Sequence, residues 1–216
     1  MYYWGCSSSG RAPALQAGCS GFKSCHLHQV KFMKPHTVNN LDNFISGWYI
    51  DPEVCDTVVQ KAERDTSVFV QGVKEFYKIV DLKEFNIDLY NTYCNHLHSV
   101  IELYKEKYPL CHKEMQVWSF TPPRIQRYNP GEYYSSTHCE NNGSAITMNR
   151  HLAYMTYLND LSDGGGTEFV LQKLTTPAEK GLTLIWPAGW THHHRGVVSN
   201  TEVKYIITGW LNFSWL

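Results

Sequence analysis

The feature that most constrains the fold is a series of short segments, rich in β-branched and aromatic residues, that begins at Met115 and runs to the C-terminus. Turn-forming stretches separate these segments: TPP, NPGE, NNGS, SDGGG, PAEKG, PAG and SNTE. About eight segments at roughly ten-residue spacing are typical of a β-sandwich or barrel. We therefore expect residues 115–216 to form such a core.

Two helices are predicted ahead of this core. The stretch DPEVCDTVVQKAER offers Asp51 as an N-cap, a proline at the first helical position and an apolar stripe of Val54, Val58 and Ala62. The stretch IDLYNTYCNHLHSVIELYKEKYP predicts a second helix that stops at Pro109. Helices followed by strands indicate an α+β fold, with the helices packed on one face of the sheets.

The first 38 residues are rich in Ser, Gly and Cys and lack periodicity, so we expect a flexible extension over 1–38. One domain should follow over 39–216, with helical support over 51–108 and the β-core over 115–216. A zinc knuckle could be read in the extension from four residues, but their spacing fits no common zinc pattern. These four residues are Cys19, Cys25, His26 and His28.

Charge and cysteine content restrict the partners and the compartment. With 19 Lys plus Arg against 20 Asp plus Glu, the chain has no field to drive binding to nucleic acid or a membrane surface. Seven scattered cysteines argue against a disulfide framework, and no apolar window has the length of a membrane helix. We expect a cytoplasmic protein in a reducing compartment; the oligomeric state is not defined by the sequence.

Two places in the strand region offer metal ligands. Alternate residues of a strand face the same side, so His138 and Glu140 of the HCE stretch share one face. The same parity in the triple histidine puts His192 and His194 on one face and His193 on the other. Two imidazoles and one carboxylate leave the opposite coordination positions open, which is the arrangement of non-haem Fe(II) oxygenases.

Lys204 lies in an otherwise apolar segment. The stretch GVVSNTEVKY reads as a hairpin, and its turn is nearly equidistant from His194 and Lys204, so both could face one interior. An unpaired buried ammonium costs on the order of several kcal/mol, and an inward Lys204 therefore requires an anion such as a ligand carboxylate. The alternative, with Lys204 in solvent and its apolar neighbours in the core, is equally compatible with parity.

From about Asn40 to the C-terminus the chain resembles the prolyl 4-hydroxylase-like branch of the Fe(II)/2-oxoglutarate-dependent oxygenases, especially small bacterial and viral members. The matching pieces occur in the family's order: RYNPGEYYSSTHCE, then RHLAYMTYLND with GGGTEF, then KGLTLIWPAGWTHHHRGV, with Lys204 ten residues beyond His194. The resemblance implies a double-stranded β-helix, an eight-stranded jelly-roll barrel.

The resemblance also implies roles for individual residues. His138, Glu140 and His194 become the iron ligands, although most relatives have aspartate at the position of Glu140. Lys204 becomes the partner of the far carboxylate of 2-oxoglutarate. Three further residues match positions that line or hydrogen-bond this co-substrate: Tyr128, Tyr157 and Thr208.

The candidates for contact with the substrate lie around the predicted site. They are Arg195, Trp190 and Tyr134. An outward salt bridge is the alternative for Arg195, and core packing is the alternative for Trp190. We expect His192 at the cavity rim, His193 facing away, and the loop 141–149 beside the entrance.

The function implied is an Fe(II)- and 2-oxoglutarate-dependent dioxygenase that uses O2, with ascorbate as a supporting reductant. Its sharpest form is a peptidyl-prolyl hydroxylase, but the scaffold also suits other peptide, protein or small-molecule substrates. The alternative is a cupin-like, metal-binding jelly-roll module without redox turnover. A zinc hydrolase is less favoured, because the chain lacks an H-E-x-x-H motif.

Overall fold

The computed structural model describes residues 42–72, 77–113, 115 and 118–214. The described residues from Asn43 onward belong to one compact unit. The predicted extension over 1–38 and the four candidate zinc residues within it lie outside the described residues. None of the helices in the described ranges combines the length and the apolar character needed to cross a bilayer.

Both predicted helices are present. Helix α2 spans Pro52–Arg64, and the Asp51 carboxylate accepts a hydrogen bond from the backbone N–H of Glu53 at 2.9 Å, as an N-cap does. Helix α4 spans Ile87–Lys107 and ends before Pro109. The described residues also contain four shorter helical elements: η1 (Thr66–Val68), α3 (Leu82–Phe85), η3 (Pro109–Cys111) and η4 (Trp190–His192).

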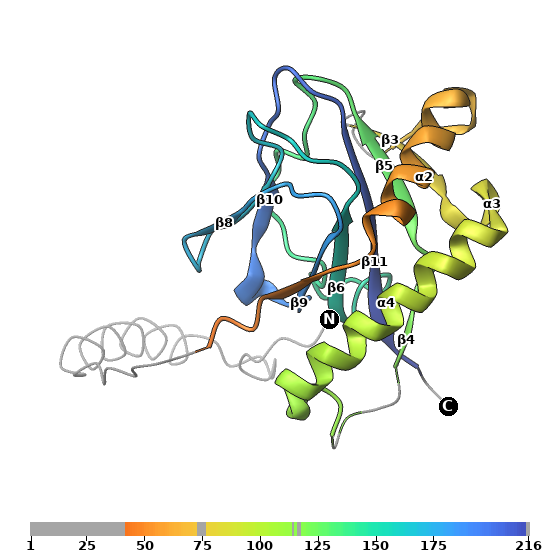
Figure 1. The fold of residues 1–216 in the computed structure, drawn as a ribbon. Coiled ribbons are helices and arrows are strands. Elements are labelled where there is room, and N and C mark those ends of the chain that lie inside the picture. The colour runs from red at the N-terminus through yellow and green to blue at the C-terminus, as the bar shows by residue number, and fades with distance from the viewer. Residues whose placement is uncertain (1–41, 73–76, 114, 116–117, 215–216) are drawn as a thin grey trace, which may run out of the picture. The chain divides into compact units, whose positions relative to one another are not determined.

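The strands form two antiparallel sheets (Figure 1). The larger sheet has the order β1-β9-β6-β11-β5-β3-β2, with β4 also paired to β11. Its strands are β1 (Ser46–Tyr49), β2 (Val70–Gln71), β3 (Lys78–Asp81), β4 (Trp118–Phe120), β5 (Arg124–Tyr128), β6 (Arg150–Tyr157), β9 (Leu182–Pro187) and β11 (Lys204–Phe213). The smaller sheet has the order β10-β7-β8, with β7 (Thr167–Phe169), β8 (Leu174–Thr176) and β10 (His194–Gly196).

The described part of the C-terminal region contains eight strands, β4 to β11, which is the predicted number. The set of eight strands differs from the predicted set at two places. The stretch YYSSTHCE contributes only a bridge between His138 and His194, whereas β8 was not predicted. Strands β1, β2 and β3 also lie among the helices, so the order of helices first and strands after is wrong in detail. Strands of two to four residues carry too little alternation to be recognised.

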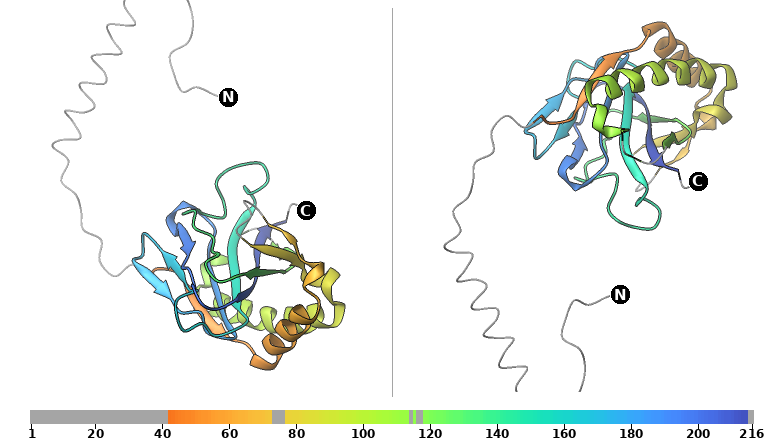
Figure 2. Two further views of the ribbon diagram at one scale, coloured as in Figure 1. Left: turned by 90° about the horizontal axis from the view of Figure 1, so that it is seen from above. Right: turned by 90° about the horizontal axis from the view of Figure 1, so that it is seen from below.

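The helices cover one face of the larger sheet (Figure 2), where apolar residues of α2 and α4 pack in one cluster with residues of the sheet. Strand β11 shows the division most clearly. Tyr205, Ile207 and Leu211 belong to the cluster on the helical side, while Lys204 and Thr208 line a cavity on the other side. This arrangement is compatible with the predicted jelly roll, in which side chains alternate between two faces.

The predicted hairpin over GVVSNTEVKY does not form. Strand β10 pairs with β7 in the smaller sheet, whereas β11 pairs with β4, β5 and β6 in the larger one. The intervening segment is instead held by the Asp163 carboxylate, which accepts hydrogen bonds from the backbone N–H groups of Asn200 at 2.8 Å and Thr201 at 2.9 Å. His194 and Lys204 therefore reach the same cavity from two different sheets.

Candidate active site

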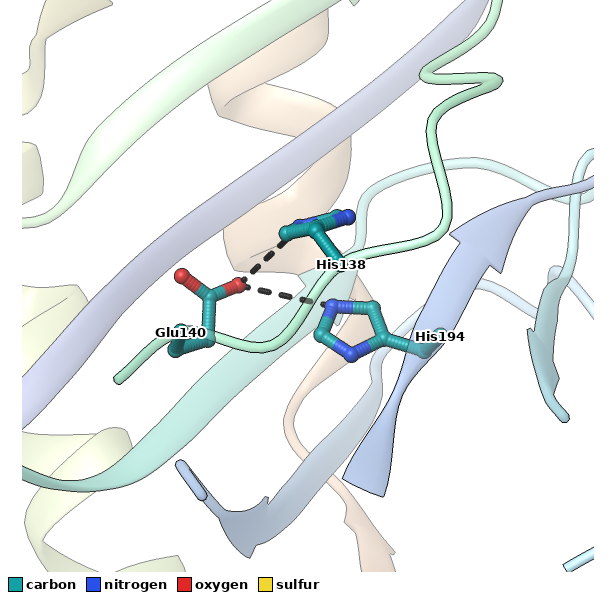
Figure 3. A group of neighbouring side chains, drawn as sticks. All are labelled: His138, Glu140 and His194. Carbon is teal, nitrogen blue, oxygen red and sulfur yellow. Dashed lines mark ion pairs between the residues drawn. The ribbon is translucent and has the colours of Figure 1, made fainter. Parts of the chain in front are cut away.

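Three side chains converge on one point between the sheets (Figure 3). Glu140 Oε1 lies 3.5 Å from His138 Nε2 and 3.4 Å from His194 Nε2. The candidate ligand atoms all lie within 4.8 Å of one another. The backbones of the two histidines are joined by a pair of hydrogen bonds, 3.0 Å and 2.9 Å long, which fixes the irregular segment around His138 against β10.

The backbone determines which ring nitrogens face Glu140. Nδ1 of His138 lies 2.9 Å from the carbonyl of Ser136, and Nδ1 of His194 lies 2.9 Å from the carbonyl of His192. A carbonyl only accepts, so both Nδ1 atoms donate, and each neutral ring directs its Nε2 lone pair at Glu140.

Such lone pairs repel a carboxylate unless either a proton on each Nε2 or a metal ion lies between them. The donor set of two nitrogens and one oxygen therefore fits a divalent metal ion. Ligands about 2.1 Å from a metal and at right angles are roughly 3 Å apart, which is close to the separations observed here.

The carboxyl group of Glu140 is held in its charged form. Burial alone would raise its pKa, but hydrogen bonds and charge from His138 and His194 lower the pKa well below its usual range. Burial also lowers the pKa of His138, yet the contact with Glu140 outweighs it and the pKa is raised overall. The cluster therefore combines a fixed negative charge with two nitrogen donors, which is an environment that attracts a cation.

The second oxygen of Glu140 is turned away from the histidines. Oε2 accepts hydrogen bonds from Trp210 Nε1 at 2.6 Å and from Arg150 Nη1 at 3.3 Å. The Arg150 guanidinium in turn stacks over the Trp210 ring, 3.6 Å from its centroid. These contacts leave only Oε1 for a metal and restrain the Glu140 side chain.

The cluster opens into a cavity of about 400 Å³. Lys204 lines this cavity from β11 and is 6% exposed. Within the described ranges its ammonium has no hydrogen bond or ion pair; it lies 5.5 Å and 5.4 Å from the ring centroids of Tyr128 and Tyr157. Burial lowers the pKa of Lys204 to about 7. A buried cation surrounded by rings is well suited to receive an anionic group of a ligand.

The three other residues predicted to contact the co-substrate are placed differently from one another. Tyr128 lines the cavity, and its hydroxyl donates to Gln126 Oε1 at 2.7 Å. Thr208 also lines the cavity, but its hydroxyl donates to the backbone carbonyl of Tyr154 at 3.0 Å. Tyr157 is fully buried outside the lining, and its hydroxyl is hydrogen-bonded within the core, so only its ring is near Lys204.

Of the three candidates for substrate contact, only Tyr134 lines the cavity, with its ring centroid 4.4 Å from that of His138. Arg195 points outward from β10 and donates to Glu168 Oε2 at 2.7 Å, so the structure shows the alternative of a surface salt bridge. Trp190 is 70% exposed and lies outside the cavity lining, which corresponds to neither of its predicted placements.

His192 also differs from the prediction. It ends the 3₁₀ element η4, is buried, and contacts the carbonyl of Asn43 through Nε2 at 2.8 Å. It is not part of the cavity lining. Strand parity placed it at the cavity rim because the triple histidine was taken as one continuous strand, whereas β10 begins only at His194.

Several residues of the cavity were not predicted. The most important are Arg124, Gln126, Arg150 and Trp210. A signal for three of these was present. Trp210 follows Lys204 and Thr208 at even spacing on β11, and Arg124 and Gln126 precede Tyr128 in the same way on β5. The loop 141–149 contributes Asn142 and Thr147 to the lining, beside the cluster where the entrance was expected.

Taken together, the N,N,O cluster and Lys204, which has no ionic partner among the described residues, define a candidate site for a metal and a dicarboxylate. Residues 123–212 match the family model described as the 2OG-Fe(II) oxygenase superfamily. This match confirms the resemblance to the Fe(II)/2-oxoglutarate-dependent oxygenases. The superfamily implies Fe(II), 2-oxoglutarate and O2 as cofactor and co-substrates. No curated protein sequence matches the chain at a significant level.

Solved structures share the fold at low identity. The viral collagen prolyl hydroxylase of Paramecium bursaria Chlorella virus-1 has a TM-score of 0.62 and 16% identity, over 80% of this chain and 97% of that chain. A Pseudomonas putida prolyl-4-hydroxylase has a TM-score of 0.59 and 13% sequence identity, over 80% of this chain and 94% of that chain. A Trichoplax adhaerens prolyl hydroxylase was solved in complex with a hypoxia-inducible factor oxygen degradation domain peptide. It has a TM-score of 0.59 and 14% sequence identity, over 96% of both chains.

Proposed function

We propose that the protein is an Fe(II)- and 2-oxoglutarate-dependent dioxygenase that hydroxylates a C–H bond, and that its substrate is a prolyl residue in a peptide. The observation that carries the proposal is the placement of the His138–Glu140–His194 cluster and Lys204 in the same cavity. A metal site alone leaves the buried ammonium of Lys204 without a counter-charge, whereas a dicarboxylate co-substrate supplies one. This distinguishes the proposal from a cupin-like module without turnover.

Each residue has a defined task in this proposal. Iron, held by the Nε2 atoms of His138 and His194 and by Oε1 of Glu140, would supply the oxidative chemistry: one oxygen atom of O2 enters the substrate, and the other enters 2-oxoglutarate, which becomes succinate and CO2. Lys204 would neutralise the far carboxylate of 2-oxoglutarate and so fix its orientation. Trp210 and Arg150 would keep Oε1 directed at the metal.

The peptide part of the proposal has two supports. The Trichoplax adhaerens prolyl hydroxylase, which shares the fold, was solved with a peptide bound. In this chain, Tyr77 and Tyr134 line the cavity beside the metal cluster, with ring centroids 6.3 Å apart. Aromatic faces of this kind pack well against the compact ring of proline.

The test measures turnover of proline-containing peptides in the presence of iron, 2-oxoglutarate and oxygen. We expect succinate release and a 16-dalton gain in peptide mass, with loss of both in His138→Ala and His194→Ala. The matched control is His98→Ala, which removes an exposed imidazole from α4 and should leave turnover unchanged. Undiminished turnover in both ligand variants would overturn the proposal.

A further inference from the structure

The residues that line the cavity carry more positive than negative charge. Three cationic residues, Arg124, Arg150 and Lys204, line it, whereas Glu140 is the one acidic residue among the described lining residues. A cavity that binds a neutral substrate has no need of such an excess, because each unpaired cation must be desolvated when the substrate enters. The excess therefore points to a substrate that brings negative charge.

The co-substrates do not remove this excess. A divalent metal is balanced by Glu140 and by the near carboxylate of 2-oxoglutarate, and Lys204 is balanced by the far carboxylate. The charges of Arg124 and Arg150 then remain without an anionic counterpart of their own. Of these two groups, Arg150 is already committed as a donor to Oε2 and the backbone carbonyl of Glu140.

Arg124 is free to bind. It begins β5, is exposed, and its guanidinium lies 5.4 Å from the centroid of the Trp210 ring, so the same indole that contacts Glu140 also lies beside Arg124. Asp81 is its neighbour in register on β3, but the carboxylate of Asp81 caps α3 by accepting from Lys83 N at 2.9 Å. In the part of the chain that the structure describes, the Arg124 guanidinium forms no hydrogen bond or ion pair.

We propose that the substrate is an acidic peptide, with an aspartate or glutamate close to the oxidised residue, and that Arg124 binds this carboxylate. The planar guanidinium offers two parallel N–H donors to a carboxylate, and the Trp210 ring supports it from one side. An extended peptide advances roughly 3.3 Å per residue, so the acidic residue would lie within about three residues of the oxidised one. The oxidation step rests on the function proposed above, whereas the selective binding does not.

The experiment compares three peptides of one sequence that differ at a single position near the proline, with Glu, Gln or Lys. Binding is measured by calorimetry, without oxygen, on the full chain loaded with Mn(II) and 2-oxoglutarate. We expect the Glu peptide to bind about tenfold more tightly than the Gln peptide, which corresponds to ~1.4 kcal/mol, and the Lys peptide to bind most weakly. The preference should shrink as salt is added.

Three variants separate this role from a general effect of charge. Arg124→Gln should abolish the preference, Arg124→Glu should reverse it in favour of the Lys peptide, and Arg64→Gln, which removes an exposed arginine at the end of α2, should preserve it. Reversal by Arg124→Glu is a result that a merely structural role of Arg124 would not produce.

The outcomes for this inference and for the proposed function are distinguishable. Equal affinities for the three peptides, or no binding of any of them, would overturn the inference. Selective binding of the Glu peptide without any oxidation under turnover conditions would support the inference and contradict the proposed function. Oxidation of all three peptides with the same KM would support the proposed function and contradict the inference.

Discussion

At the scale of single residues, Lys204 is a buried amine whose ammonium has no hydrogen-bond or ion-pair partner among the described residues. Its pKa is lowered by burial from 10.5 to about 7. Between these two values the unfolded chain binds a proton that the folded chain does not, so without a ligand the free energy of unfolding should rise with pH over this window. Below about pH 7 both states are protonated, and the full cost of burying the charge is present.

Lys204→Met tests this cost. The methionine fills a similar volume without charge, so we expect the variant to be more stable than the native protein at pH 7, by ~1–3 kcal/mol, and to lose affinity for 2-oxoglutarate. Denaturant unfolding and calorimetry measure the two effects. A variant that is less stable than the native protein would show that Lys204 has a stabilising partner in the folded state.

The same residue predicts a pH dependence of co-substrate binding. A bound carboxylate restores the charged form of Lys204, so binding above pH 7 takes up a proton, and the affinity for 2-oxoglutarate should fall by up to about tenfold per pH unit above this value. Calorimetry of the Mn(II)-loaded protein at pH 8, in phosphate and in Tris, counts the protons from the difference in enthalpy. An affinity that is independent of pH, with no proton uptake, would contradict the assignment.

Trp210 predicts an effect on the metal rather than on 2-oxoglutarate. Trp210→Phe keeps the ring under Arg150 but removes the Nε1 donor to Glu140 Oε2, so we expect metal affinity to fall by about tenfold. Trp190→Phe is the matched control, because Trp190 is exposed and outside the cavity lining. Equal Mn(II) dissociation constants for the native protein and both variants would show that the hydrogen bond from Trp210 to Glu140 Oε2 does not contribute to metal binding.

At the scale of elements, the sequence predicted correctly those features that depend on interactions between residues close together in the chain. The cap at Asp51, the apolar stripe of α2 and the stop before Pro109 all concern neighbours in sequence, and these predictions are confirmed. The hairpin between β10 and β11 was wrong, because its turn signal at Ser199–Asn200 is satisfied by Asp163 instead of by a strand partner. The partner lies 36 residues from Ser199, a distance that sequence spacing cannot reveal.

The glycine-rich turn before β7 gives a prediction at this scale. A Cβ at Gly166 would lie 1.9 Å from the backbone oxygen of Thr176, which is part of β8 and cannot move as a side chain could. Gly166→Ala should therefore destabilise the protein by ~1–3 kcal/mol and weaken metal binding, because β7 pairs with the strand that carries His194. Denaturant unfolding and Mn(II) titration measure both effects.

Gly189→Ala is the control for this substitution, since nothing lies within 4 Å of a Cβ there and its backbone has ordinary φ. Equal free energies of unfolding for Gly166→Ala and Gly189→Ala would contradict this prediction, because they would show that the turn accommodates the added Cβ without loss of stability.

At the scale of the whole molecule, the site exists because two sheets meet. His194 comes from the smaller sheet and Lys204 from the larger one, while His138 and Glu140 lie on the irregular segment between β5 and β6. Motif order allowed these four residues to be predicted as a group. Arg124 was missed although its even spacing from Tyr128 on β5 indicated the cavity face. Arg150 was missed because its place in the cavity depends on the register of β6 with β11, which the sequence does not display.

The most direct test of the central claim is the absorbance spectrum of the protein under anaerobic conditions as 2-oxoglutarate is titrated into its Fe(II) complex. The account predicts a metal-to-ligand charge-transfer band that saturates with one equivalent per chain. The band should be lost in His194→Ala and should require far more 2-oxoglutarate in Lys204→Met. Iron binding without such a band in the native protein, or an unchanged titration in Lys204→Met, would contradict the account.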